Sequence, residues 1–290
     1  MLACNQAEAP SESASLDGTL PKSDIKFPLI SIVIPSYNKA PYLAHTLNSI
    51  CTQRYPNFEV IIQDGGSTDG SEEIIKDFAG KYPKIIRWVS QKDNGQVDAI
   101  NTGLQKAKGE ILAYINADDV YYQGAFLSVG KVFLEEPETL WVTGYGDIID
   151  NQGRKISSLV TIYKNIFLRL NLPFFLLVFN YITQPATFFS RKAYLKHGPF
   201  SGTRNYVMEY DLWLKLSKLS MPRVIRRNLA SFRLTTDNIS ATSFNDLLAL
   251  DYGIARKYTG NYLILVFHYL HNLARIGLIR VIKGNSFIII

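Results

Sequence analysis

After residue 26 the chain alternates two hydrophobic patterns. Runs of consecutive apolar residues, many of them β-branched, predict buried strands at Leu29–Pro35, Phe58–Gln63, Ile85–Val89 and Glu110–Ile115. Apolar residues spaced three and four apart predict intervening helices at Pro41–Cys51, Ser71–Phe78 and Gln96–Lys106. This alternation predicts an α/β fold with a doubly wound, Rossmann-like, mostly parallel sheet flanked by helices, whose ligands bind at the carboxyl ends of the strands.

The pattern is less regular after Gly124. A helix, a strand near Leu140–Gly144 and a hairpin turn at Asp150–Gly153 are expected there. The segment 162–182 is strongly apolar, but charged residues, asparagines and a proline interrupt it, so we expect no transmembrane helix. The stretch Tyr262–Ile290 mixes apolar and basic residues. It predicts an amphipathic helix that either lies on a membrane surface or packs on the core.

Composition and charge indicate which partners and which compartment suit this fold. The 290-residue chain is 47% hydrophobic, with a formal net charge of +6 and a pI of about 9.1. This charge favours an anionic partner, such as nucleic acid, an anionic membrane surface or a phosphorylated substrate. Its two cysteines, Cys4 and Cys51, suggest neither a disulfide framework nor a zinc site and are consistent with a cytoplasmic setting. Residues 1–26 are rich in Ser, Ala, Glu and Pro and predict a flexible tail.

Polar residues gather where the predicted strands end. Directly after the fourth strand come Asn116, Ala117, Asp118 and Asp119. Two adjacent carboxylates at the mouth of a buried strand are unfavourable unless a cation or solvent compensates their charge. Mg²⁺ and Mn²⁺ bind such oxygen ligands together with substrate phosphates, so the pair is a candidate metal site. The alternative is an Asx turn or a helix cap without chemistry.

Four polar clusters together resemble the nucleotide-sugar half of glycosyltransferase family 2. In chain order they are Ser31–Asn38 (SIVIPSYN), Asp64–Gly70 (DGGSTDG), Asn94–Asn101 (NGQVDAIN) and Asn116–Asp119 (NADD), and the resemblance covers Leu29–Trp213. It implies a GT-A fold and a DxD-type site for Mn²⁺ or Mg²⁺. It also implies inverting transfer of a sugar from a nucleotide diphosphate donor, with a UDP-sugar favoured, to a hydroxyl acceptor.

The resemblance implies roles for individual residues. Those expected to line the base and ribose pocket are Pro35, Tyr37, Asn38, Asp64, Gln96 and Asp98. Asp118 matches the metal-binding acid, with Asp119 beside it. Two positions depart from the family pattern. Asn116 replaces the first acid of DxD and still offers an oxygen to ribose or metal, while Gly65 replaces a second acid after Asp64, which makes base selectivity less secure.

A second acidic segment, Met208–Trp213 (MEYDLW), resembles the part of the family that supplies the catalytic base. Aligning its Leu-Trp pair places Glu209 at the base position, with Asp211 as the substitute candidate. An inverting displacement requires a carboxylate that takes the proton of the acceptor hydroxyl as it attacks. Without that role, the two acids are simply favourable charges in the first turn of a helix. Trp141 and Trp213 are candidates for stacking on a sugar or for core packing.

Two other functions stay open at this point. A nucleotidyltransferase of similar architecture would also use acids and a metal, although the segment SYNKAPY lacks the glycines of a phosphate-binding loop. A non-enzymatic binding module would use the positive charge. However, Lys and Arg are concentrated in Arg223–Arg233 and in the C-terminal segment, and no RNA-binding motif occurs, so no nucleic-acid partner is expected.

The preferred interpretation divides the chain into four parts. These are a flexible tail (1–26), a nucleotide-sugar half (27–122), an acceptor-binding half of the same domain (123–250) and a C-terminal amphipathic helical segment (251–290). Basic residues and the segment 162–182 are expected to hold the enzyme on the inner face of an anionic membrane. There it would reach a glycan or lipid-linked acceptor in cell-envelope polysaccharide or glycolipid synthesis.

Overall fold

The computed structural model describes residues 26–156, 159–200, 207–235 and 244–284, so the predicted tail lies outside the described residues except for Lys26. The strands are β1 (Ile30–Ser36), β2 (Phe58–Asp64), β3 (Ile86–Ser90), β4 (Ile111–Tyr114), β5 (Val120–Tyr121), β6 (Trp141–Ile149), β7 (Lys155–Ile156), β8 (Thr187–Ser190) and β9 (Arg223–Arg233). The α-helices are α1 (Ala40–Cys51), α2 (Ser71–Lys81), α3 (Gln96–Lys106), α4 (Ala125–Glu135), α5 (Leu159–Leu170), α6 (Pro173–Phe179), α7 (Arg191–His197), α8 (Met208–Ser217), α10 (Phe244–Tyr258) and α11 (Tyr262–Gly284), and a 3-10 turn spans Gln184–Ala186.

The first half forms the predicted parallel sheet. β3, β2, β1 and β4 lie side by side in that order and pair in parallel. The register sets Ser36 beside Asp64, and Asp64 beside Ser90, so three strands end at one edge. β4 stops at Tyr114 opposite Val33, so the residues that follow it reach the same edge. The sheet therefore brings the polar clusters together, as the alternation predicts.

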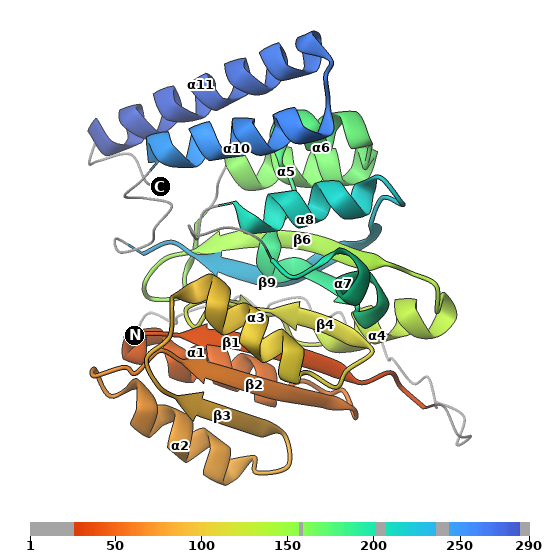
Figure 1. The fold of residues 1–290 in the computed structure, drawn as a ribbon. Coiled ribbons are helices and arrows are strands. Elements are labelled where there is room, and N and C mark those ends of the chain that lie inside the picture. The colour runs from red at the N-terminus through yellow and green to blue at the C-terminus, as the bar shows by residue number, and fades with distance from the viewer. Residues whose placement is uncertain (1–25, 157–158, 201–206, 236–243, 285–290) are drawn as a thin grey trace, which may run out of the picture.

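The second half continues the same sheet with a different pairing. β8 joins β4 in an antiparallel pair, and the order continues through β6, β9 and β5. The α/β class is confirmed, and parallel pairing is confined to β1–β4 and to the β6–β9 pair. The turn predicted at Asp150–Gly153 leads from β6 into the short antiparallel strand β7. Figure 1 shows the two halves of the sheet joined edge to edge.

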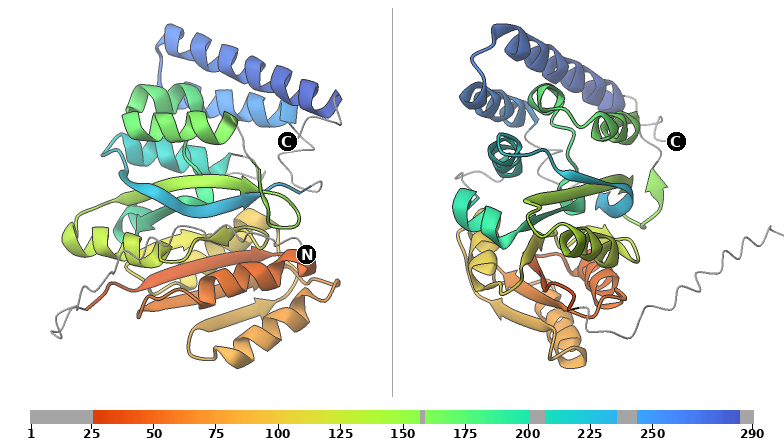
Figure 2. Two further views of the ribbon diagram at one scale, coloured as in Figure 1. Left: turned by 180° about the vertical axis from the view of Figure 1, so that it is seen from behind. Right: turned by 90° about the vertical axis from the view of Figure 1, so that its right-hand side faces the viewer.

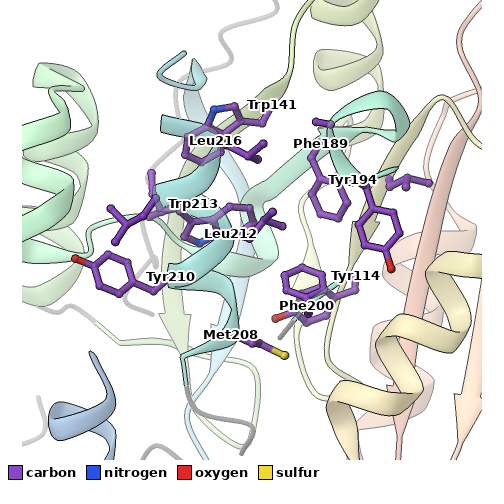
Figure 3. Packing of buried hydrophobic residues seen from close by; sticks show 14 of the residues in the cluster. Tyr114, Trp141, Phe189, Tyr194, Phe200, Met208, Tyr210, Leu212, Trp213 and Leu216 are labelled. Carbon is purple, nitrogen blue, oxygen red and sulfur yellow. The ribbon is translucent and has the colours of Figure 1, made fainter. Parts of the chain in front are cut away.

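Both faces of the sheet are covered by apolar side chains, which is why its central strands are continuously hydrophobic. In β1, Ile32 and Ile34 belong to the core on the side of α1, whereas Val33 belongs to the core on the side of α3 and α8. In that second core, Trp141 and Trp213 stack on each other with ring centroids 5.4 Å apart (Figure 3). Both rings are buried, so core packing accounts for them rather than sugar stacking.

The apolar segment 162–182 forms two helices rather than one. α5 ends before Asn171, which has a positive φ of 47°, and Pro173 begins α6. α11 lies beyond them and α10 beside them, as both views of Figure 2 show. Within the described residues, no helix combines the length and the apolar character that crossing a membrane requires. The domain boundaries at residues 122 and 250 stay predictions.

Candidate functional site

The loop after β1 is fastened to the loop after β2. The backbone amide of Asn38 donates to Ser67 Oγ at 2.9 Å, and Asn38 Oδ1 accepts from the Thr68 amide at 2.9 Å. Asn38 has a positive φ of 49°, a conformation that Asn tolerates better than most residues. Tyr37, next to it, is 62% exposed. This pairing presents an aromatic ring at the sheet edge, where a flat base can stack, while Pro35 is buried inside β1.

Asp64 organises the second loop. Its buried carboxylate accepts hydrogen bonds from the Gly66 and Ser67 amides at 3.2 and 2.9 Å. It also accepts from Ser67 Oγ at 2.6 Å and from Ser90 Oγ at 2.7 Å. Asp64 thus joins the ends of β2 and β3. The hydrogen bond expected between Asp64 and a nucleotide base stays a prediction.

Asp93 is a site residue that the sequence reasoning missed. A Cβ at Gly65 would lie 3.2 Å from the Asp93 carboxylate and 3.3 Å from the Tyr37 ring. Asp93 also accepts a hydrogen bond from the Gly95 amide at 2.8 Å. The acid that position 65 lacks in sequence is therefore supplied in space by the loop after β3. The signal was its place in the polar run Lys92–Gly95, directly after a predicted strand.

The start of α3 lines the same edge. Asp98 accepts from the backbone amide and the side-chain amide of Asn94 at 3.2 and 3.3 Å, which closes the turn before the helix. Gln96 Nε2 donates to Asn116 Oδ1 at 2.6 Å. The structure therefore places Gln96 against the loop after β4, whereas Asp98 stabilises its own loop. Contacts of both residues with a nucleotide stay predictions.

The two acids after β4 have different surroundings. Asp118 Oδ2 accepts from Lys39 Nζ at 2.7 Å, so a cation already neutralises this carboxylate. Asp119 is fully buried, and its oxygens accept from the Arg233 amide at 2.8 Å and from Asn116 Nδ2 at 3.2 Å. Burial, followed by the charge of Asp118, raises the pKa of Asp119 well above its ordinary value. Metal binding by Asp119 stays a prediction, and these contacts favour Asp118 as the ligand.

The residues around Asp118 fit a metal ion whose remaining ligands are phosphate oxygens of a substrate. Within the described ranges, no group of three or more His, Cys, Asp or Glu side chains forms a closed cage. Mg²⁺ and Mn²⁺ commonly bind one or two carboxylates together with substrate phosphates, which requires no such cage. Asp118 offers one carboxylate at a site that already holds the Lys39 ammonium. Lys39 was not among the predicted site residues, although it lies directly after the SIVIPSYN motif.

The two acids of the second pair, Glu209 and Asp211, also have different surroundings. Glu209, in the first turn of α8, accepts a hydrogen bond from the Tyr114 hydroxyl. Burial raises the pKa of Glu209, while the Tyr114 hydrogen bond and the charge of Lys164 oppose that rise. Asp211 instead accepts from Tyr258 Oη at 2.8 Å and pairs with Lys215 Nζ at 2.8 Å. These contacts tie Asp211 to the scaffold and favour Glu209 as the base.

Tyr114 connects the two parts of the site. It is the last residue of β4, two residues before Asn116, and its backbone carbonyl accepts from Gln184 Nε2 at 2.8 Å. Its hydroxyl reaches Glu209 across the core seen in Figure 3. No pattern in the sequence indicates this contact, because a tyrosine at the end of an apolar strand is also an ordinary core residue. Tyr114 thus connects the candidate metal-binding loop, which follows it in the chain, to the candidate base, which its hydroxyl contacts.

The fold and the arrangement of these acids together define a glycosyltransferase. More particularly, the chain belongs to glycosyltransferase family 2, because the model described as "Glycosyl transferase family 2" matches residues 31–198, more than half of its length. An uncharacterized glycosyltransferase of Rickettsia prowazekii is 26% identical over 250 residues, which are 84% of this chain and 77% of the relative. One of Nostoc is 34% identical over 132 residues, covering 46% of this chain and 41% of the relative.

Solved structures confirm a GT-A type of fold. A mannosyltransferase of Pyrobaculum calidifontis, in complex with GDP-Man and Mn²⁺, has a TM-score of 0.64 at 19% identity over 90% of this chain and 76% of its own. S. aureus TarS (residues 1–349), in complex with UDP-GlcNAc, has a TM-score of 0.61 at 16% identity over 84% of this chain and 72% of its own. At these identities the likeness shows the fold alone.

Proposed function

We propose that this glycosyltransferase is an inverting, metal-dependent enzyme that transfers a sugar from a nucleotide diphosphate to a hydroxyl acceptor. The observation that carries the proposal is the Tyr114–Glu209 hydrogen bond. It holds the Glu209 carboxylate, whose pKa is raised, against Tyr114, a residue four positions before Asp118 in the chain. A proton acceptor and an anchor for a diphosphate would thereby lie near each other, as a single-displacement transfer requires.

The donor would occupy the edge formed by β1, β2 and β3. Tyr37 is available to stack on the base, and the Asp64 and Asp93 carboxylates are acceptors for its N–H groups. The similar solved structures include one with a GDP-sugar and one with a UDP-sugar. Both uracil and guanine present N–H donors to such acids. We propose a UDP-sugar as the donor. Titration with different nucleotides determines which nucleotide base the site accepts.

The diphosphate would lie over the loop after β4, held there by Asp118 with Mn²⁺ or Mg²⁺. When bound, the metal would neutralise the charge that develops on the departing diphosphate. Asn116 links this loop to Gln96 and fixes its conformation. Arg233 Nε donates to the Asp118 carbonyl at 2.7 Å and supports the loop from behind. The donor would thus meet a loop that is already positioned.

The transfer step needs only one proton acceptor. The acceptor oxygen forms a bond to the anomeric carbon while the bond from that carbon to the diphosphate oxygen breaks, which inverts the configuration. The hydroxyl proton passes to the Glu209 carboxylate, and the nucleotide diphosphate leaves with the bonding electron pair. Burial raises the pKa of Glu209 and makes its carboxylate a stronger base than an exposed one. We propose a glycan or lipid-linked hydroxyl as the acceptor.

The donor site is tested by calorimetric titration of UDP, GDP and dTDP, each with and without Mn²⁺. One nucleotide is expected to bind in a Mn²⁺-dependent way, and Asp118→Ala is expected to abolish that dependence. Glu209→Gln is the matched control, because it should bind the nucleotide like the wild type while losing transfer. If a folded wild-type protein binds none of the three nucleotides, the proposed function is wrong.

A further inference from the structure

Two neighbouring helices, α5 and α11, expose apolar stripes. On α5 the exposed residues recur three and four apart, and on α11 they do the same, so each set lies along one side of its helix. The side chains are between 44 and 76% exposed. Together they form what we call the α5–α11 face: Leu159, Ile162, Ile166, Leu170, Leu263, Phe267, Leu270 and Leu273.

The two stripes border each other. Tyr163 on α5 packs edge-on against His271 on α11, with ring centroids 6.1 Å apart. Phe179 at the end of α6 meets the same His271 ring at 5.0 Å. The side of α11 that is buried carries His268 and Asn272 instead. α11 therefore packs on the molecule along one side and exposes apolar residues on its opposite side. Figure 2 shows the position of this helix above α5 and α6.

The charges around this face have one sign. The sequence has no Asp or Glu between residues 159 and 182, and none from residue 252 to the end, in a chain with 25 acidic residues. The same two segments contain seven basic residues: Lys164, Arg169, Arg256, Lys257, Arg275, Arg280 and Lys283. An apolar stripe with basic residues nearby is the pattern of a helix that binds in the plane of an anionic membrane surface.

We propose that the α5–α11 face docks on the surface of an anionic lipid bilayer. Leucine, isoleucine and phenylalanine side chains would enter the boundary between headgroups and acyl chains, and the net positive charge of these segments would attract the anionic headgroups. A second copy of this chain is a poorer occupant. A symmetric pairing through this face would bring two sets of basic residues together, which is unfavourable.

The face lies on the outer side of the helix that borders the base. Lys164, whose charge acts on Glu209, and Ile166 are on opposite sides of α5, separated by about 10 Å, the diameter of one helix. Docking would therefore bring the site close to the lipid surface, where a lipid-linked hydroxyl is found. This last step rests on the proposed function, whereas the docking itself does not.

The test compares two double variants with the same change in charge. Ile166→Glu with Phe267→Glu alters the α5–α11 face, and Leu134→Glu with Leu195→Glu alters exposed leucines on α4 and α7. All four side chains are exposed, so neither variant removes core packing. Removing the C-terminal residues would be less informative, because α11 also contributes the buried Leu265 to the core.

Flotation is measured with vesicles of phosphatidylcholine plus phosphatidylglycerol, and with phosphatidylcholine alone. The wild type and the α4/α7 variant are expected to float with the anionic vesicles and less with the neutral ones. The face variant is expected to bind the anionic vesicles at least about tenfold more weakly. Docking is overturned if the wild type does not float, or if both variants lose binding equally.

Two further measurements separate the other outcomes. If sedimentation shows a wild-type dimer that only the face variant dissociates, and no vesicle binding occurs, the face is an interface between copies and the proposal is wrong. Titration of the nucleotide into both variants gives an independent readout of the donor site. Binding of nucleotide without flotation rejects the docking alone, whereas flotation without nucleotide binding rejects the proposed function alone.

Discussion

The loop after β4 and the first turn of α8 use a pair of acids in the same way, although one segment is a loop and the other a helix. Each carries two acids close together in sequence, Asp118 with Asp119 and Glu209 with Asp211. In each pair one acid is held by the scaffold. Asp119 accepts from the backbone of β9, and Asp211 is bound by Tyr258 and Lys215. The other acid of each pair contacts a site residue, Lys39 or Tyr114 respectively.

This comparison shows that, in a short acidic motif, one residue is available to bind a ligand while its neighbour stabilises the fold. Neighbouring side chains on a loop or a helix point in different directions, so two adjacent acids cannot both face one ligand without special geometry. The acid that faces inward is buried and must find donors there, as Asp119 does with the Arg233 amide. The other acid of the pair is left to bind a cation, as Asp118 does with Lys39, or to take a proton.

The largest expected effect separates Glu209 from Asp211. Glu209→Gln keeps the shape of the side chain but removes the base, and it should lower kcat by about 10² to 10⁴ while nucleotide binding is kept. Asp211→Asn should instead lower the stability by about 1 to 3 kcal/mol, because it weakens buried contacts with Tyr258 and Lys215. Transfer rates and thermal unfolding of both variants check this. A large loss of kcat in Asp211→Asn but not in Glu209→Gln would mean that Asp211 is the base and Glu209 the structural acid.

The sequence predicted the region around the first acid pair well. Apolar runs located β1 to β4 to within about one residue at most ends, and the rule that ligands bind at strand ends placed Asp64, Asn116 and Asp118 on one edge. This works because each strand carries its own signal in consecutive residues. The metal-binding role predicted for Asp118 likewise rests on local sequence alone.

The sequence was less informative wherever the site depends on contacts between distant segments. Asp93 reaches Gly65 from another loop, and Tyr114 reaches Glu209 across 95 positions. Nothing in the spacing of either residue indicates its partner. The antiparallel entry of β8 beside β4 also follows from packing in the second half, where β8 is short and the strands are irregularly spaced along the chain.

The second expected effect separates Asp119 from Asp118. Asp119→Ala leaves the Arg233 amide and the Asn116 side chain without an acceptor in a buried place, which should lower the free energy of unfolding by about 1 to 3 kcal/mol. Asp118→Ala breaks a pair whose Lys39 partner is partly exposed, which should cost about 0 to 1 kcal/mol. Denaturant unfolding measures both. Equal losses would mean that the two acids are equally structural.

The smallest expected effect is on the pH dependence of transfer. Glu209 must be deprotonated to act as a base, so activity falls as the pH falls through its raised pKa. The Tyr114 hydroxyl donates to the carboxylate and thereby lowers this pKa. Tyr114→Phe removes that donor, so the pKa should rise further and the acidic limb of the profile of kcat against pH should move toward higher pH.

The direction of this shift distinguishes positioning of the base from ordinary packing. Above the shifted limb, Tyr114→Phe should retain most of its rate, because the deprotonated carboxylate is still present there. Tyr194→Phe is the matched control: its hydroxyl belongs to the same core but lies 3.4 Å from Asn101, in a contact that does not include Glu209. A uniform loss of rate at every pH in Tyr114→Phe, with no movement of the limb, would show that Tyr114 acts on the fold and not on the proton affinity of Glu209.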